Sequence, residues 1–364
     1  MTKAARFLAK VYDKTGATLK KVIDSEMMIE LPRISREASK ATSDITLTLA
    51  LPWDDFGYGT EIAEFFLVKL YAINEAHPSG YLVYQGFITE ISGMLSRDTS
   101  HIELRLFPLE SILGNAFWKS GSGQSLADYT VAYGGADIDQ ILSEAVTNVN
   151  TLYGTSYLTS DLGNPGLSIA VDFVEQTHLQ AIERAAKFLD ATWYWRVKPD
   201  GTLQLRQYAD ATADHRLILG THIESLDVTR TLLDMRNGVR VEYTGPAYAF
   251  SSDSASETAY GKRQKKIADG SIQDGTSATA LGDGEVARLK DVKIQTQVVV
   301  NAQYDLESIL PGDTCRIVNV PDTASQMVSG VFRILRTEYD GTTMSLHLSE
   351  IARNFGVEFA RAIE

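Results

Sequence analysis

The stretch 295–350 limits the possible folds more than any other part of the chain. In its last arm Met344, Leu346 and Leu348 alternate with polar residues, which predicts a strand with one buried face and one solvent-facing face. The dipeptide at 340–341 is Asp-Gly, and glycine tolerates the positive φ of a tight hairpin turn. We therefore predict a small antiparallel β module. Its elements are two strands and a hairpin, at 295–303, 314–320 and 327–350.

The N-terminal third contains a similar series of elements. Both series have a strand, a loop, a second strand and a hairpin, of similar lengths and in the same order. In both, a glycine stands near the start of the first hairpin strand, Gly86 in one and Gly330 in the other. Two like modules in one chain are what a pseudo-symmetric ring requires, because a trimer would present six of them. The N-terminal elements are expected at 43–52, 53–64, 65–73, 81–95 and 101–107.

Between the two modules the pattern changes from strands to helices. Apolar residues at helical spacing predict helices at 136–150 and at about 177–190, and a hairpin follows at 192–208. The expected buried stripes are Ile138, Ile141, Leu142, Ala145 and Val149 in the first helix, and Leu179, Ile182, Ala186 and Leu189 in the second. The residue pairs that resemble capping boxes are Asp137 with Gln140 and Thr177 with Gln180.

The expected fold class is α+β, mainly β, with two similar small antiparallel β-barrel modules and an intervening α+β domain. Residues 249–290 are small, polar and glycine-rich, so we expect an insertion with at most one short helix near 284–290. A single helical turn is expected at 109–115. The expected divisions are 1–114 for the first β-barrel module, 115–221 for the α+β middle domain, 222–352 for the second β-barrel module with a polar insertion at about 247–290, and 353–364 for a C-terminal tail.

Composition excludes several classes of function. The 34 Lys and Arg residues against 47 Asp and Glu give a net charge of −13, and such a field repels the phosphate backbone of nucleic acids. Cys315 is the only cysteine, so no disulfide or thiolate cluster can form within one chain, and we expect a small buried side chain. The N-terminus lacks the apolar core of a signal peptide, and no apolar run reaches membrane-spanning length. We therefore expect synthesis in the cytoplasm and no membrane span.

The residue types that carry chemistry do not gather in the sequence. None of the six histidines has a partner at metal-ligand spacing, and solvated or capping roles are usual at the positions of His178 and His215. Asp54 and Asp55 are adjacent in an expected loop, without an apolar pocket to shift a pKa. The segment 121–125 has neither a P-loop lysine nor a G-x-S-x-G elbow. The histidines stand at positions 77, 101, 178, 215, 222 and 347.

One basic cluster and one aromatic cluster remain. The four cations within 262–266 could contact nucleic acid or an acidic protein, but a solvated, charge-balancing loop is the usual role. Trp193, Tyr194 and Trp195 could stack on sugars, but strand alternation predicts that two rings face the helix at 177–190 and one faces outward. We therefore expect no catalytic, no cofactor-binding and no metal-binding residue, and no cofactor.

Several stretches together resemble the baseplate-hub proteins of tailed bacteriophages. This group includes the late-control D proteins and the N-terminal hub part of tail-associated proteins. The resemblance covers nearly all of the chain and is specific only in combination. The stretches that carry it are TLTLALP, YQGFITEI, HLQAIERAAKFLDATWYWRVKPDGTLQLRQY, RNGVRVEY, AYGKRQ and AQYDLESILPGDTCRIVN.

The resemblance implies a homotrimer in which two barrel modules per chain form a pseudo-sixfold ring. Such a ring would join the sixfold tail tube to a threefold tip or fibre in the virion tail tip or baseplate. The implied partners are the distal tail protein or tail tube ring, the tape measure protein and the tip or fibre proteins, with DNA only in transit through the lumen. Acidic charge fits such a lumen, because like charges prevent sticking. Cell-wall cleavage would belong to another protein, so no enzymatic activity is expected.

Two other functions are compatible with the residues. A peptidoglycan or glycan hydrolase could use Asp54 or Asp55 together with the aromatic residues at 193–195. A cell-surface carbohydrate-binding module could use the same aromatic residues without catalysis. The absence of paired carboxylates in a recognisable setting favours the structural role.

Overall fold

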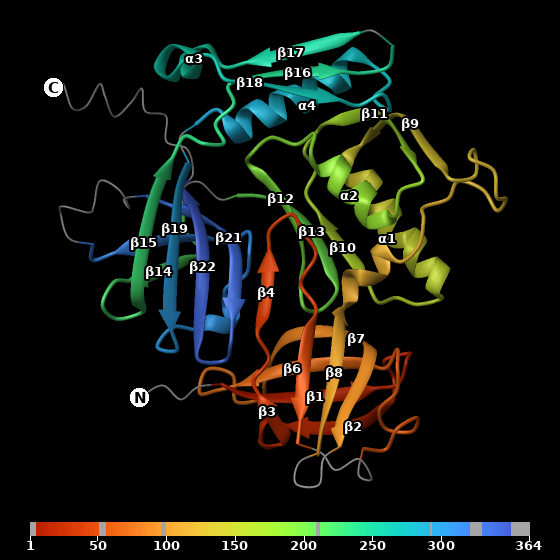
Figure 1. Ribbon diagram of the computed structural model, residues 1–364, viewed down its shortest axis with the longest axis vertical. Coiled ribbons are helices and arrows are strands. Elements are labelled where there is room, and N and C mark those ends of the chain that lie inside the picture. The colour runs from red at the N-terminus through yellow and green to blue at the C-terminus, as the bar shows by residue number, and fades with distance from the viewer. Residues whose placement is uncertain are drawn as a thin grey trace.

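The computed structural model describes residues 5–50, 56–95, 100–208, 212–245, 247–291, 293–320 and 330–350. Asp54, Asp55, the expected loop at 321–326 and the expected tail at 353–364 lie outside these residues. Within them the chain is mainly β, as the sequence predicted, with two large curled sheets and a group of helices beside them (Figure 1). No helix of this described part is long and apolar enough to cross a membrane.

The first curled sheet lies at the bottom of Figure 1. Its strands are β1 (Arg6–Tyr12), β2 (Leu19–Asp24), β3 (Met28–Glu30), β5 (Ile45–Leu49), β6 (Leu67–Ile73), β7 (Tyr81–Leu95) and β8 (Ser100–Pro108). Their order is β2-β1-β6-β7-β8-β5-β3, with antiparallel pairs throughout. Alternation buries one face of this sheet. In β1, for example, Phe7, Ala9 and Val11 are fully buried.

The second curled sheet lies at the left of Figure 1. Its strands are β4 (Ile34–Glu37), β14 (His215–Ile218), β15 (Ile223–Thr231), β19 (Lys293–Asn301), β20 (Thr314–Val318), β21 (Phe332–Tyr339) and β22 (Thr343–Glu350). The order is β14-β20-β21-β22-β19-β15, and β4 also pairs with β21. The predicted turn at Gly341 is present with φ +90°, and Met344, Leu346 and Leu348 are buried as predicted.

The repeat predicted from the sequence is present in the two sheets. Strands β6-β7-β8-β5 of the first sheet have the same order as β20-β21-β22-β19 of the second. Both long hairpins contain a β-bulge, at Thr89 in one and at Leu335 in the other. Strand β14 pairs with β20, although the division by sequence placed residues 215–218 in the middle domain. The boundaries at 114, 221 and 352 stay a prediction.

The middle of the chain forms helices and two small sheets, which lie to the right of Figure 1. Its elements are β9 (Thr130–Asp137), α1 (Ile138–Tyr153), β10 (Thr159–Leu162), β11 (Ser168–Val174), α2 (His178–Ala186), β12 (Trp193–Val197) and β13 (Thr202–Gln207). Both predicted helices are confirmed, and all five residues of the predicted α1 stripe are buried. The capping box of Thr177 and Gln180 is present. The prediction of a capping box at Asp137 is wrong. This carboxylate makes no capping hydrogen bond and accepts one from the Ser168 hydroxyl instead.

The buried face of α2 also differs from the predicted stripe. Ile182 is fully buried as predicted, but Leu179 and Ala186 are partly exposed. His178 and Ala185 are fully buried in their place. The helix is therefore rotated toward the side that buries the histidine ring.

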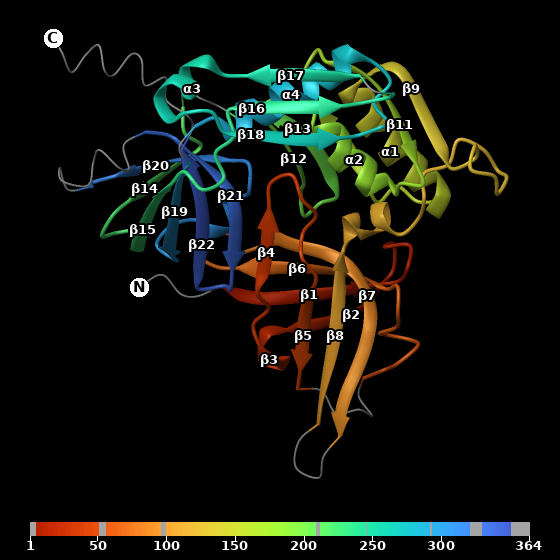
Figure 2. The same ribbon diagram turned by 45° about the horizontal axis from the view of Figure 1, so that its top comes forward.

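The prediction that residues 249–290 form a polar insertion with at most one short helix near 284–290 is wrong, because the segment is more structured. This part of the chain contains two helices and two strands, which combine with β16 (Gly238–Glu242). The three strands lie side by side in the order β17-β16-β18, with α4 packed behind them (Figure 2). The elements are β17 (Tyr248–Ser252), α3 (Ser254–Tyr260), β18 (Gln264–Ala268) and α4 (Gly275–Leu289).

Two hydrophobic cores organise the described residues. The first core runs through both curled sheets without interruption and includes Val68 of β6 and Val298 of β19. The second core joins α1 and α2 to α4, and it receives Leu67 and Phe87 from the first sheet. The helical turn expected at 109–115 is the 3-10 helix η3 (Leu109–Gly114), which also enters the second core.

Candidate assembly site at the junction of the two β modules

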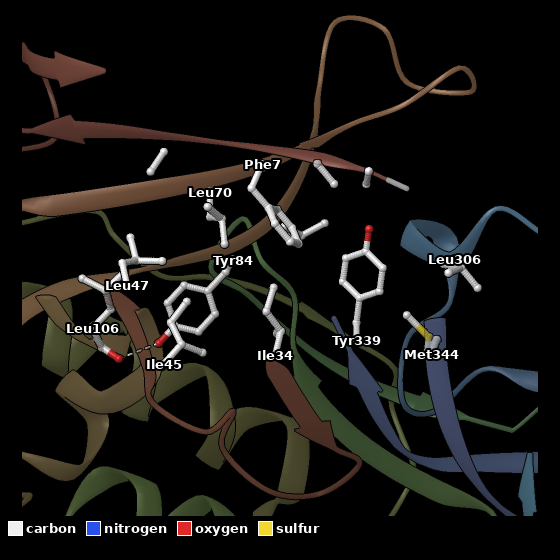
Figure 3. Close-up of a cluster of buried hydrophobic side chains, with 14 of the residues drawn as sticks. Phe7, Ile34, Ile45, Leu47, Leu70, Tyr84, Leu106, Leu306, Tyr339 and Met344 are labelled. Atoms are coloured by element: carbon white, nitrogen blue, oxygen red, sulfur yellow. Dashed lines mark hydrogen bonds between the residues drawn. The ribbon is translucent and has the colours of Figure 1, made fainter. Parts of the chain in front are cut away.

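The two curled sheets meet through aromatic packing in the first core. Phe7 of β1 contacts Tyr339 of β21 edge to face, with ring centroids 5.8 Å apart. The backbone N–H of Ala5 donates to the Gly341 carbonyl over 2.8 Å. Figure 3 shows Ile34 of β4 between Tyr84 of the first sheet and Tyr339 of the second. The junction is therefore a continuous core rather than a surface contact between two separate barrels.

Residues 34–42, which we call the strap, connect three parts of the molecule. Its first half is β4, an antiparallel partner of β21 in the second sheet. Ser39 then donates its backbone N–H to the Trp195 carbonyl of β12 over 2.8 Å. Thr42 donates its backbone N–H to the Glu110 carboxylate of η3, also over 2.8 Å. The strap thus fixes both modules and the middle of the chain relative to one another.

Two ionisable side chains are buried at the strap, Arg36 within it and Glu110 against it. Arg36 is only 8% exposed, and its burial lowers the pKa to about 10, although the Glu110 carboxylate opposes this change. Burial also raises the pKa of Glu110, against the hydrogen bonds from Thr42. Arg36 is still protonated at neutral pH, so a positive charge is held inside the junction. Such a buried polar group favours one specific arrangement of its neighbours over others.

A second polar cluster joins the second module to the middle of the chain. Arg196 of β12 donates to the Asp313 carboxylate over 2.7 Å and to the Pro311 carbonyl over 2.9 Å. His215 Nε2 lies 3.1 Å from the other carboxylate oxygen of Asp313. Burial alone would raise the pKa of Asp313, but the hydrogen bond from His215 and the Arg196 charge outweigh it and lower the pKa. Asp313 is therefore ionised and holds both partners.

A third group brings together residues that are far apart in the sequence. His77 Nε2 lies 2.8 Å from Asp305 Oδ1, although 228 residues separate the two. Buried Glu307 accepts a hydrogen bond from the Tyr339 hydroxyl. Sequence spacing could not indicate this group, because its members come from loops of different modules. The expectation that no residue binds metal stays untested.

Both histidines expected to be solvated or capping are buried, and so is Cys315. His178 stacks on Trp118 with ring centroids 5.5 Å apart, and its Nε2 lies 2.8 Å from the Asn148 amide oxygen. The expectation is therefore wrong for His178, and it is wrong for His215, which lies in the cluster with Asp313. Burial lowers the pKa of His178, so this ring is neutral at pH 7. Cys315 is fully buried as predicted, and burial raises the pKa of its thiol.

The aromatic stretch of β12 offers no exposed sugar platform. Trp193 and Trp195 face the second core, as alternation predicted. Tyr194 does not face outward as expected, because it packs on Tyr208 and against Gly312 of the second module. A Cβ at Gly312 would lie 2.0 Å from the Tyr194 ring, so only glycine permits this approach.

The remaining candidates have local structural roles. Lys265 forms an ion pair with Glu285 and Lys266 one with Glu242, each at 2.8 Å, so the charge-balancing role is confirmed for these two cations. They lie in strand β18 rather than in a loop. In the glycine-rich segment 121–125, Ser125 donates both its backbone N–H and its hydroxyl to Asp128, which closes the loop on itself.

Comparisons with known proteins add the following findings. No family model matches the chain, and no curated protein matches it. Among solved structures, the 43 kDa tail protein of prophage MuSo2 from Shewanella oneidensis superposes with a TM-score of 0.65 at 13% identity. The superposition covers 95% of this chain and 98% of that one.

Two further structures agree over the same extent. A tail protein from Neisseria meningitidis MC58 gives a TM-score of 0.61 at 15% identity, over 96% of this chain and 97% of its own. Prophage tail protein gp18 from Listeria monocytogenes EGD-e gives 0.60 at 9% identity, over 98% of each chain. The protein therefore has the fold of phage tail proteins, as the resemblance of its sequence to baseplate hubs predicted.

Proposed function

We propose that this chain is a structural component of a phage or phage-like tail tip, where three copies form a pseudo-sixfold ring. The ring joins the sixfold tail tube to a threefold tip or fibre. One observation carries the proposal: two modules with the same strand order are fused through one core and fixed by the strap. Three such chains supply six similar modules in a rigid arrangement.

Apolar side chains are exposed on the edge strands of the first sheet, where a neighbouring subunit could bury them. Strands β2 and β3 are the two edges of the first sheet. Leu19 and Val22 on β2 and Ile29 on β3 are between 45% and 53% exposed. Edge strands with exposed apolar residues invite pairing with another chain, so natural proteins usually cover them. This supports an assembled state.

The proposed role is mechanical and involves no catalytic step. The neighbours in the assembly would be the distal tail protein or tube ring, the tape measure protein and the tip or fibre proteins. DNA would pass through the lumen, and the net charge of −13 would keep it from adhering. The aromatic residues of β12 do not favour a glycan-binding alternative, because they are buried or half-buried.

The mass of the assembly tests the proposal directly. Light scattering coupled to size exclusion is expected to give about 120 kDa, which corresponds to three chains of 40.0 kDa each. Negative-stain images should then show rings with six similar lobes. A species of 40.0 kDa at every concentration, both alone and with the tube protein of the same particle, would overturn the proposal.

A further inference from the structure

Three side chains of metal-binding types converge where the two modules meet. His77 lies in the loop between β6 and β7. Between β19 and β20, Glu307 lies in the 3-10 helix η4 (Leu306–Ser308) and Asp305 directly precedes it. Each offers one ligand atom, and all three atoms lie within 4.8 Å of one another. Ligands that share a cation at roughly 2.0–2.6 Å are separated by about 3–5 Å. Small side-chain movements would therefore suffice for coordination.

Glu307 is a buried carboxylate that forms no ion pair with any described residue. It is only 5% exposed, and no Lys, Arg or His of the described residues lies within ion-pair distance of it. Its hydrogen bond comes from the neutral Tyr339 hydroxyl. Buried carboxylates are normally paired with a cation or coordinate a metal. The burial of Glu307 is independent of the spacing of the three ligands, and a metal ion is a partner that suits such a carboxylate.

The residues around the group hold it in place. The Tyr339 hydroxyl donates a hydrogen bond to Glu307 and so orients its carboxylate. The His77 ring packs on Tyr81 with centroids 4.7 Å apart, and the His77 backbone N–H donates to Asn74. Hydrogen-bonded outer partners of this kind are typical of metal ligands, because they fix the ligand orientation.

A cavity of about 260 Å³ lies beside the two carboxylates. Among the described residues, its lining includes Asn74 and Glu75 from the first module together with Asp305 and Glu307, and no lysine, arginine or histidine. The cavity is large enough for several water molecules, which could complete a coordination shell. The cavity reaches the group from the side of its two carboxylates, because Asp305 and Glu307 line it and His77 does not.

We propose that His77, Asp305 and Glu307 bind a divalent transition-metal cation of the Zn²⁺ class and so crosslink the two modules. One imidazole nitrogen with two carboxylate oxygens suits Zn²⁺ or Mn²⁺, whereas Ca²⁺ and Mg²⁺ prefer sites made of oxygen alone. The ligands come from both modules of one chain, so binding does not depend on the oligomeric state. A monomer would bind equally, which separates this test from that of the ring.

The experiment is calorimetric titration of the metal-depleted full-length chain with Zn²⁺, and then with Mn²⁺, Ca²⁺ and Mg²⁺. We expect saturable binding of one Zn²⁺ per chain and a thermal unfolding midpoint that rises by roughly 3–5 °C at saturation. Asp305→Asn and Glu307→Gln should each weaken Zn²⁺ binding by at least about tenfold. Tyr339→Phe keeps all three ligands and should weaken it by about tenfold through the lost orienting hydrogen bond.

His101→Gln is the matched control, because His101 also lies near a carboxylate, that of Glu103 at 3.8 Å, on the same module. This variant should bind Zn²⁺ as the wild type does. Asp305 has a side chain that is 39% exposed, so Asp305→Asn should fold even if the buried Glu307→Gln does not. The proposal is overturned if no saturable Zn²⁺ binding occurs. It is equally overturned if binding survives Asp305→Asn unchanged, or if His101→Gln abolishes it.

Discussion

The two β modules have the same four-strand order, but their sheets are completed in different ways. The first sheet takes all its strands from residues 6–108. The second takes β4 from the N-terminal segment and β14 from the chain that follows the middle helices. The repeated strands define the module, whereas the added strands define what it is attached to. The second module therefore depends on the first, and the first has its own complete set of strands.

The modules also differ in how they contact the middle of the chain. The first contributes apolar side chains, among them Leu67 and Phe87, to the second core. The second uses the polar cluster of Arg196, His215 and Asp313, in which Arg196 and Asp313 form an ion pair. Apolar contacts depend little on pH, whereas an ionised cluster depends on it directly. Each difference can be tested by a variant that changes one module's contact and leaves the other's intact.

Removing the aromatic contact between the modules should have the largest effect. Phe7→Ala empties a fully buried position that touches Tyr339, and we expect a loss of about 3–5 kcal/mol in the free energy of unfolding. Because the core is continuous, hydrogen exchange should become faster in β21 and β22 as well as in the first sheet. Urea unfolding combined with hydrogen exchange measures both effects.

Phe65→Ala is the matched control, because this phenylalanine of the first module is 64% exposed. It should change the free energy of unfolding by less than about 0.5 kcal/mol. If Phe7→Ala accelerated exchange in the first sheet alone, the two modules would be energetically separate. The two modules would then behave as independent folding units.

A methyl group added at Gly341, in the turn between β21 and β22, tests the same contact between the modules from the second module. A Cβ at Gly341 would lie 2.9 Å from the Phe7 ring, and the backbone has φ +90°. Gly341→Ala should therefore cost about 2–4 kcal/mol, from backbone strain and from the clash together. Gly59→Ala has a similar φ of +79° and nothing within 4 Å, so it should show the strain alone, about 1–2 kcal/mol. If urea titrations gave equal losses of unfolding free energy for the two variants, the contact with Phe7 would make no contribution.

The repeat could be predicted from the sequence because each of its strands carries a clear alternation with turn residues at its ends. Strand β4 could not be predicted in this way. It has only four residues, two of them charged, and Ser35 meets Arg336 across 301 positions of the chain. Nothing local identifies such a pairing. The junction that fixes the modules was therefore missed, although the modules themselves were predicted.

Of helix α4 only the C-terminal end was predicted, as a short helix near 284–290, and the rest was missed for a different physical reason. Its sequence contains three glycines, which lower the intrinsic tendency to form a helix. Two of them are required by packing: a Cβ at Gly282 would lie 2.6 Å from the Ser251 hydroxyl, and one at Gly284 would lie 2.8 Å from the Leu189 carbonyl. Close contact with the second core therefore outweighs local propensity. For His178 the prediction was wrong because polar residues at the start of a helix are usually exposed, whereas this ring is fully buried.

Acid should loosen the second module from the middle of the chain. The pKa of Asp313 is held below its usual 3.8, so its contribution to stability is complete above the unfolded pKa of about 3.9 and is lost as pH falls through the lower folded value. At pH 7, Asp313→Asn should lose about 2 kcal/mol of unfolding free energy. Wild type and variant should converge as pH falls below about 4. Urea titrations from pH 7 to pH 3 measure the gap, and a gap of constant size would show that the carboxylate charge does not hold this contact.

The smallest effect is expected at the exposed ion pair beside the strap. Arg33 lies 2.5 Å from Glu338, but its side chain is 69% exposed, so solvent screens the attraction. Arg33→Ala should change the free energy of unfolding by less than about 1 kcal/mol, and that change should vanish at high salt. A loss as large as that of Phe7→Ala would mean that surface charge holds β4 against β21. The small loss that we expect would instead show that backbone pairing and the shared core hold the two modules together. Through these contacts β4, which comes from the N-terminal part of the chain, joins the sheet of the second module.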